Sequence, residues 1–285
     1  NCISSQRHGF KMTLIQNALQ GAQRHVQSYP WGDAVWHVWG SQNTATASPL
    51  VLLHGGSGSW THWVRNVQYL SQHRTVWALD LPGFGDSDVP DDVRDADTLA
   101  PYVGQILQHT FDGAAVDVMG FSFGGMTAGL LAAEQPACIK QMILVGVPGL
   151  GLFGEVLPMR GMSPDMTDTQ QRAVHRHNLK AMMLAHDSSI DEALIDLQQA
   201  NVARDRMRRR RIARTDVLTQ VQANWTCAVH GVWGELDALY LGTLQQVPQV
   251  LSKLASFTSV PDAGHWVMFE RPDAFHAAVD PLLKA

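Results

Sequence analysis

The feature that most constrains this chain is the repeated alternation of short apolar runs with stretches of helical spacing. Leu50 to Leu53 form a continuous apolar run, which is typical of a parallel strand buried on both faces. Similar runs predict strands near residues 75–80, 114–122, 140–149, 227–237 and 256–260, with helical stretches between most of them. This order predicts an α/β fold with a doubly wound, mostly parallel sheet.

Other segments carry weaker signals. Residues 13–28 place Leu14, Ala18, Leu19 and Ala22 at helical spacing, which predicts a short amphipathic helix. Residues 34–40 alternate and predict a strand, and helices are expected at 62–71, 97–110, 123–135 and 241–253 and from residue 272 onward. Asp97 or Thr98 is the expected cap of the helix over 97–110.

The alternation stops between residues 150 and 223, where Met-rich helical segments replace the strands. We interpret this stretch as a helical insertion over one edge of the sheet, with residues 1–149 and 224–285 forming the core. The basic run from Arg204 to Arg214 is interpreted as a solvated helix of the insertion, because no aromatic residues are interleaved in it. The alternative is that one of its arginines faces inward and binds a substrate carboxylate.

The composition limits the partners and the compartment. A net charge of −5 gives no footprint for nucleic acid, and no apolar run approaches the roughly 20 residues that cross a bilayer. The first twelve residues lack the apolar stretch of a signal peptide. Three cysteines without C-x-x-C spacing argue against a disulfide framework or a zinc site. We therefore expect a cytoplasmic protein without nucleic-acid or membrane partners.

A serine in a glycine-rich turn is the strongest candidate for chemistry. Ser122 lies in Gly120-x-Ser-x-Gly124, between an expected strand and an expected helix, which is the context of a nucleophile elbow. A serine nucleophile needs a base, an acid that orients the base, and donors for the oxyanion. Asp237 and His265 follow later strands, so the edge where the carboxyl ends of the strands meet would bring them to Ser122.

The stretches "LVLLHGGSGSW", "ALDLPGFGDSD", "VMGFSFGG", "GVWGELDAL" and "DAGHW" together resemble the α/β-hydrolase superfamily, from about residue 34 to the end. The resemblance implies Ser122 as nucleophile, His265 as general base and acid, and Asp237 as the orienting carboxylate. It implies the N–H groups of Gly56 and Phe123 as the oxyanion hole, and the insertion as a cap. A serine nucleophile argues against haloalkane dehalogenases and epoxide hydrolases, which use aspartate.

Two of these positions have rivals. Glu235 lies two residues before Asp237, and Ser57 follows Gly56 in the flexible "GGSGS". The family pattern favours Asp237 and Gly56. His54 and Asp80 are interpreted as structural residues.

The leading functional hypothesis is a carboxylic-ester hydrolase that acts on a small to medium, largely apolar substrate through an acyl-enzyme on Ser122, without a metal or organic cofactor. The alternative is a carbon–carbon bond hydrolase of the meta-cleavage-product type, which resembles this chain in its cap and in "GHW". However, "HGGSGSW" departs from the longer oxyanion stretch common in that group. A non-catalytic ligand receptor on the same scaffold is the hypothesis from another class. We expect a small-molecule substrate and leave a homo-oligomer open.

Overall fold

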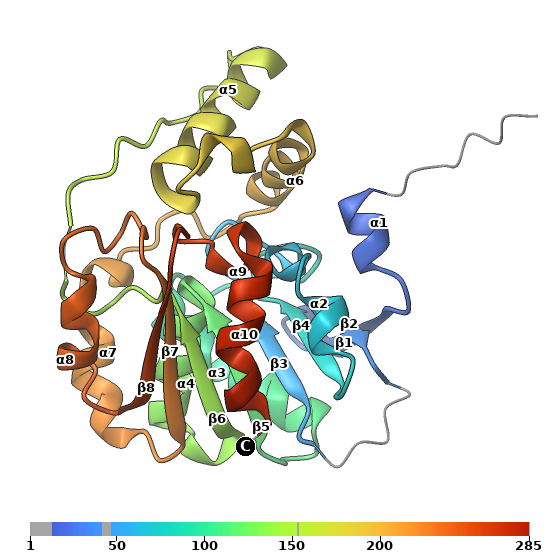
Figure 1. Ribbon diagram of the computed structural model, residues 1–285. Helices are drawn as coiled ribbons and strands as arrows, with labels where there is room; N and C mark the ends of the chain where they lie inside the picture. The colour runs from blue at the N-terminus through green and yellow to red at the C-terminus, as the bar shows by residue number, and fades with distance from the viewer. Residues whose placement is uncertain (1–12, 42–46, 153, 285) are drawn as a thin grey trace, which may run out of the picture.

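The computed structural model describes residues 13–41, 47–152 and 154–284 (Figure 1). The expectation about a signal peptide falls on the first twelve residues, which lie outside these ranges. A single eight-stranded sheet runs through the molecule in the order β1-β2-β4-β3-β5-β6-β7-β8. The strands are β1 (Gln23–Tyr29), β2 (Gly32–Trp39), β3 (Leu50–Leu53), β4 (Val76–Asp80), β5 (Val116–Phe121), β6 (Ile139–Val145), β7 (Ala228–Gly234) and β8 (Leu254–Val260).

The sheet is mostly parallel, as predicted. β2 pairs antiparallel with both β1 and β4, and every pairing from β4 through β8 is parallel. The crossovers between parallel strands place helices on both faces of the sheet (Figure 1). The predicted α/β fold with a doubly wound, mostly parallel sheet is therefore confirmed.

Two apolar cores lie on the two faces of the sheet, because successive side chains of a strand point in opposite directions. Along β3, Val51 and Leu53 join the core beneath α3 (Ala96–Thr110) and α4 (Phe123–Glu134), whereas Leu50 and Leu52 join the core beneath α2 (Val67–Leu70) and α10 (Pro272–Leu283). This double burial explains the continuous apolar run in the sequence. The helices are α1 (Leu14–Ala18), α2 (Val67–Leu70), α3 (Ala96–Thr110), α4 (Phe123–Glu134), α5 (Asp168–Asn178), α6 (Glu192–Ala203), α7 (Val217–Val221), α8 (Val247–Val250), α9 (Val267–Glu270) and α10 (Pro272–Leu283).

The structure differs from the sequence predictions at several elements. The helix expected over 13–28 is wrong beyond α1, because residues 23–29 form the edge strand β1. The helix expected over 62–71 is divided into η1 (Trp60–Trp63) and α2, and the helix expected over 241–253 shortens to η7 (Leu244–Gln246) and α8. The cap of α3 is Asp95, whose side chain accepts from the Ala96 N–H, rather than Asp97 or Thr98.

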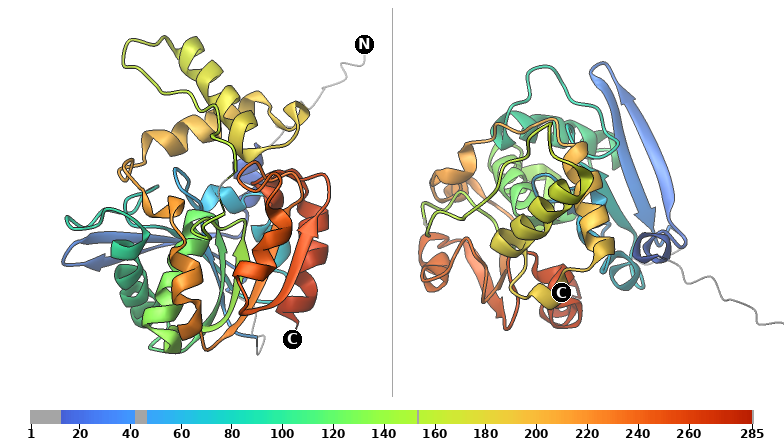
Figure 2. Two further views of the ribbon diagram at one scale, coloured as in Figure 1. Left: turned by 90° about the vertical axis from the view of Figure 1, so that its left-hand side faces the viewer. Right: turned by 90° about the horizontal axis from the view of Figure 1, so that it is seen from above.

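The helical segment, residues 150–223, lies over the carboxyl ends of the strands (Figures 1 and 2). Its described part holds α5, the π-helical turn η3 (Leu179–Met183) and α6, without a strand. Apolar side chains of α6 and η3 join the core on the α2 and α10 face. The last helix of the segment, α7, packs instead on α4, beside the sheet. None of the described helices has the length and apolar character needed to span a membrane.

Candidate active site

The turn after β5 holds Ser122 in a strained conformation. Ser122 has φ 49° and ψ −116°, a region that a residue with a Cβ enters only at a cost of roughly 1–3 kcal/mol. Its N–H donates to the carbonyl of Val145 on the neighbouring strand β6, which holds the turn in place. A strained residue fixed in this way between a strand and a helix fits the elbow predicted from the sequence.

The surrounding glycines allow the tight packing of this turn. A Cβ at Gly120 would lie 2.5 Å from the Cα of Gly125, and a Cβ at Gly124 would lie 2.4 Å from the carbonyl oxygen of His54. Both contacts are with backbone atoms, which cannot swing away as a flexible side chain can. The sequence pattern G-x-S-x-G therefore has a steric cause in this fold.

Three predicted residues, each from the loop or turn that follows a different strand, meet here. His265 Nε2 lies 3.0 Å from Ser122 Oγ, and His265 Nδ1 lies 2.8 Å from Asp237 Oδ2. Asp237 and His265 are each only 1% exposed. Because an ionised carboxylate only accepts, the arrangement assigns the imidazole proton to Nδ1, which leaves Nε2 free to accept the Ser122 proton.

Asp237 is held on both of its oxygens. Oδ1 accepts from the N–H of Leu239, and Oδ2 contacts His265. The rival carboxylate, Glu235, is exposed and lies 3.4 Å from the Ser259 hydroxyl, so the structure brings Asp237 rather than Glu235 to the histidine. Gly146 follows β6 beneath this pair with φ +56°, and a Cβ there would lie 3.2 Å from His265 Nδ1.

Two N–H groups are available as oxyanion donors at the same edge. Phe123 is the first residue of α4, where the N–H groups have no partner within the helix. Gly56 lies in the turn after β3, and its N–H has no acceptor among the residues that the structure describes. Both residues line the same pocket as Ser122 and His265.

Two buried histidines support the turn that carries Gly56. His54 Nε2 accepts from the Leu81 N–H, and its Nδ1 lies 2.7 Å from the Gly55 carbonyl. His62 Nδ1 accepts from the Gly55 N–H at 3.1 Å. Burial lowers the pKa of His54 to about 4 and holds the pKa of His62 well below its ordinary value, so both rings are neutral at pH 7. This geometry supports the structural role expected for His54.

A pocket of about 850 Å³ opens between this edge of the sheet and the helical segment. Ser122 and His265 line it together with Met159, Met162, Met182 and other residues of the helical segment, which supplies both apolar and charged side chains. Among the described residues, no group of three His, Cys, Asp or Glu side chains is placed to hold a metal ion.

A sequence profile described as "Alpha/beta hydrolase family" matches residues 50–278. This chain belongs to the alpha/beta hydrolase family. The match includes the predicted elbow and the loops that carry Asp237 and His265.

Relatives of this alpha/beta hydrolase have different described functions. A dihydrolipoyllysine-residue acetyltransferase component of an acetoin cleaving system from Pseudomonas putida is 30% identical over 78% of this chain, which spans 60% of that protein. A 2-hydroxy-6-oxononadienedioate/2-hydroxy-6-oxononatrienedioate hydrolase from Cupriavidus pinatubonensis is 26% identical over 88% of this chain and 92% of its own length. The crystal structure of an esterase from Rhodococcus sp. ECU1013 superimposes with a TM-score of 0.74 at 18% identity, covering 93% of this chain and 99% of that one, which shows the shared fold.

The basic run of this hydrolase is not the solvated helix expected from the sequence. Residues 205–211 form turns after α6 that return to the sheet, and Asp205 is buried there. Arg210 Nη1 contacts both oxygens of Asp205 at 3.0 and 3.1 Å, and Nη2 lies 3.3 Å from the Ser57 hydroxyl. A Cβ at Gly56 would lie 2.8 Å from Arg210 Nη2. The alternative interpretation, an inward-facing arginine, fits Arg210, which lines the pocket and pairs with Asp205, whereas its binding of a substrate carboxylate stays a prediction.

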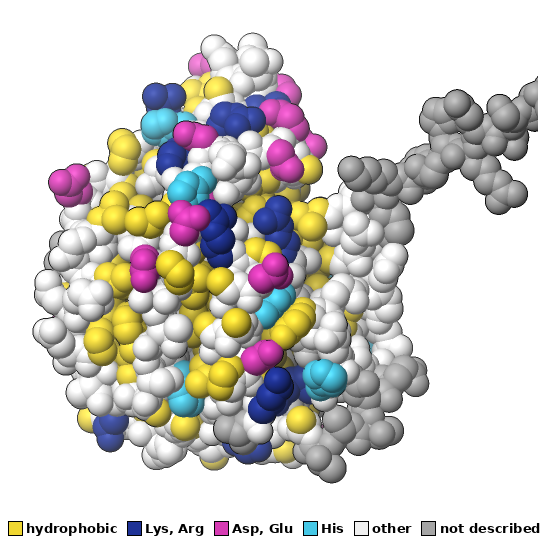
Figure 3. Space-filling model, in the orientation of Figure 1, with side chains coloured by type: hydrophobic (Ala, Val, Ile, Leu, Met, Phe, Trp, Pro, Cys, Tyr) yellow, Lys and Arg dark blue, Asp and Glu magenta, His cyan; other side chains and the backbone are white. Residues whose placement is uncertain are grey.

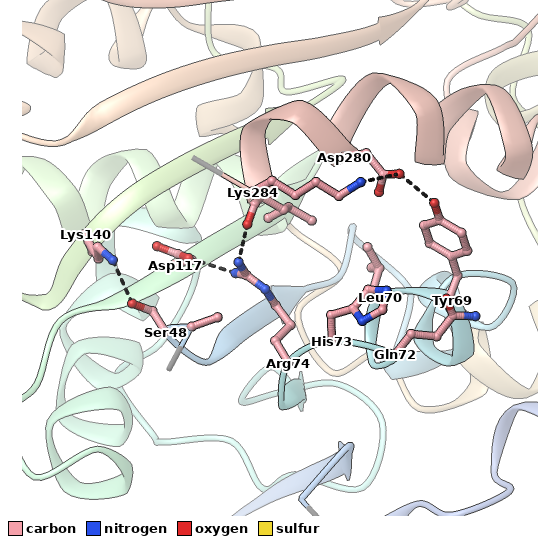
Figure 4. Close-up of a pocket in the computed structure, with 12 residues that line it drawn as sticks. Ser48, Tyr69, Leu70, Gln72, His73, Arg74, Asp117, Lys140, Asp280 and Lys284 are labelled. Carbon is pink, nitrogen blue, oxygen red and sulfur yellow. Dashed lines mark hydrogen bonds and ion pairs between the residues drawn. The ribbon is translucent and has the colours of Figure 1, made fainter. Parts of the chain in front are cut away.

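A second pocket, of about 440 Å³, lies away from the candidate active site and shares none of the residues that line the first pocket (Figure 4). Arg74 and Asp117 form a buried ion pair at 2.8 Å inside it. Lys140 donates to the Ser48 hydroxyl, and Lys284 lies 3.7 Å from Asp280. Its cations are already engaged by neighbouring groups, so we assign this pocket no ligand.

Proposed function

We propose that this alpha/beta hydrolase is a serine hydrolase that cleaves a carboxylic ester through an acyl-enzyme on Ser122. One observation carries the proposal: Asp237, His265 and Ser122 form a hydrogen-bonded line, and Ser122 and His265 line a large pocket whose wall includes many apolar side chains. This is the arrangement that serine nucleophiles need, with the base touching the nucleophile and the acid orienting the base.

The proposed reaction begins when Ser122 Oγ attacks the ester carbonyl carbon while His265 Nε2 takes its proton. The N–H groups of Gly56 and Phe123 stabilise the oxyanion, and each such donor is worth roughly 10²–10³-fold in turnover. The tetrahedral intermediate expels the alcohol, which receives the proton from His265. Water then attacks the acyl-enzyme with His265 as base, and the carboxylic acid leaves.

The helical segment acts as a cap that selects the substrate. Its methionines supply a flexible apolar wall, which suits a small to medium apolar acyl group. The fold shared with an esterase is consistent with this substrate class. No resident cofactor is required for the proposed steps.

A second candidate is the hydrolysis of a carbon–carbon bond in a dienoate of the meta-cleavage type. The Cupriavidus relative, named for that substrate class, aligns over nearly its whole length. The position of Arg210 beside Gly56 also favours a substrate with a carboxylate, although Asp205 already pairs with this arginine. For this reason we place the ester first.

The experiment has two arms. Labelling with a fluorophosphonate tests the nucleophile: we expect Ser122 to be modified in wild type and no labelling in Ser122→Ala of unchanged circular dichroism. Turnover is then compared on nitrophenyl butyrate and on a 2-hydroxy-6-oxo-dienoate. Strong dienoate turnover with negligible ester cleavage would replace the first candidate by the second, and an unlabelled Ser122 in folded protein would refute both.

A further inference from the structure

Glu270, at the end of α9, is a buried carboxylate that the proposed reaction does not use. It is 4% exposed and accepts four hydrogen bonds. Oε2 accepts from the N–H groups of Gly264 at 2.7 Å and Ala185 at 2.9 Å, and Oε1 accepts from the N–H of His186 and the hydroxyl of Ser189, both at 2.9 Å. A carboxylate has about four acceptor sites, so this one is fully engaged.

The four donors come from two different parts of the chain. Gly264 immediately precedes His265, whereas Ala185, His186 and Ser189 follow the π-helical turn η3 of the helical segment. A second contact lies beside the first, where the N–H of Trp266 donates to the carbonyl of Met183 at 2.7 Å. Of the residues on either side of the histidine, Trp266 is therefore bonded directly to the helical segment, and Gly264 is linked to it through Glu270.

The junction extends to the surface of the molecule. His186 Nε2 lies 2.7 Å from Asp262, which also pairs with Arg271. Figure 3 shows cationic, anionic and histidine side chains lying together where the upper helices meet the body below them. The contacts at the surface are exposed and weak, so Glu270 is the strong and buried element of the junction.

The same loop also reaches the turn that carries Gly56. Trp266 Nε1 donates to the carbonyl of His62, and the His62 ring accepts from the Gly55 N–H. The helical segment, the histidine loop and the Gly56 turn thus form one continuous hydrogen-bonded path.

We propose that Glu270 is a positioning residue that sets the geometry of His265 from the helical segment. The inference rests on the proposed function, because it assigns His265 as the base. Glu270 touches neither substrate nor Ser122, and it acts by fixing the backbone of Gly264 relative to Ala185. Substrates that displace the segment would consequently alter the His265 to Ser122 distance, so that binding and proton transfer are coupled.

The test uses Glu270→Gln, which keeps the size of the side chain but turns one acceptor oxygen into an NH₂ group that faces N–H donors. We expect kcat on the best substrate to fall about 10- to 100-fold, the cost of a small misplacement of a catalytic group, with a smaller change in KM. Amide exchange at Gly264 and Ala185, followed by NMR, should accelerate. Glu192→Gln is the matched control, because Glu192 is a surface carboxylate of the helical segment that pairs with Arg172 and Arg176. It should change neither kcat nor the exchange rates at Gly264 and Ala185.

A kcat within twofold of wild type for Glu270→Gln would overturn the proposal, as would a fall in kcat without faster exchange at Gly264. If Glu270→Gln does not fold, Ser189→Ala removes one donor from the segment side alone, and an unchanged kcat and exchange rate there would refute the coupling. Exchange needs no substrate, and labelling of wild-type Ser122 is read separately, so a failure of the proposed function is distinguishable from a failure of this inference.

Discussion

Replacing Asp237 by asparagine should remove most activity by moving the imidazole proton of His265 from Nδ1 to Nε2. Asp237 Oδ1 accepts from the Leu239 N–H, so in Asp237→Asn the amide oxygen must keep that position and the NH₂ group must face His265. The Nδ1 atom lies 2.8 Å from that site and can then only accept. The imidazole proton moves to Nε2, which faces Ser122 and can no longer take its proton.

The expected loss in kcat is on the order of 10⁴-fold, the effect of the wrong tautomer in a triad of this kind. It corresponds to roughly 5 kcal/mol of transition-state stabilisation, at about 1.4 kcal/mol per tenfold change. The assay is initial-rate hydrolysis of nitrophenyl butyrate, together with the rate of fluorophosphonate labelling. The asparagine has the same shape and keeps the Leu239 hydrogen bond, so the melting temperature should change little.

Glu235→Gln is the matched control, because this exposed carboxylate lies two residues away and does not contact His265. We expect its kcat to stay close to that of wild type, because the exposed Glu235 side chain contacts Ser259 rather than His265. The reasoning is refuted if Asp237→Asn keeps kcat within tenfold of wild type while folded, or if Glu235→Gln loses as much.

Three further predictions concern stability. Gly124→Ala should destabilise the fold by about 3 kcal/mol or more in urea unfolding, because the new Cβ would lie 2.4 Å from a backbone oxygen of His54; a change below 1 kcal/mol, on the order of a surface substitution, would contradict this. Arg74→Met should cost about 3–5 kcal/mol by leaving buried Asp117 unpaired, and adding Asp117→Asn should recover much of it; no recovery would disprove the charge argument. Burial lowers the pKa of His37 and His54 to about 4, so the unfolded chain takes up their protons first as pH falls below about 6.5. The free energy of unfolding therefore falls as the pH is lowered from 7 toward 4, by up to about 1.4 kcal/mol per pH unit for each histidine. We expect His37→Gln to reduce the slope of the unfolding free energy against pH, measured between pH 7 and 5.

The strands could be predicted from the sequence because burial on both faces leaves a local mark. Leu50 to Leu53 read as a strand for the same reason that they pack into two cores. β1 has no continuous apolar run in the sequence, because it is an edge strand whose side chains are mostly exposed. It is held in place by its pairing with β2. The N-cap of α3 was not predicted because Asp95 lies before the helical pattern. Its capping position depends on the extended backbone that precedes the helix.

The residues of the candidate site could be assigned because each follows a predicted strand in a glycine-containing loop. The order of the strands then brings Ser122, Asp237 and His265 to one edge, as observed. The wall of the pocket could not be predicted. Arg210 reaches the Gly56 turn through its pairing with Asp205, and Glu270 binds donors that lie about 80 residues earlier in the chain. Such pairings depend on how two parts of the chain meet, which no local pattern records.

The sheet order has a consequence for how activity arises during synthesis. Ser122 follows the central strand β5, but His265 follows β8, which is the outermost strand on its side and pairs with β7 alone. The proposed nucleophile can therefore be folded on a nascent chain long before the proposed base has left the ribosome. β8 is only partly buried, and elements with few buried contacts open locally at a lower free energy than core strands. We therefore expect mild denaturant to abolish activity before the rest of the protein unfolds, because the C-terminal edge of the sheet opens first.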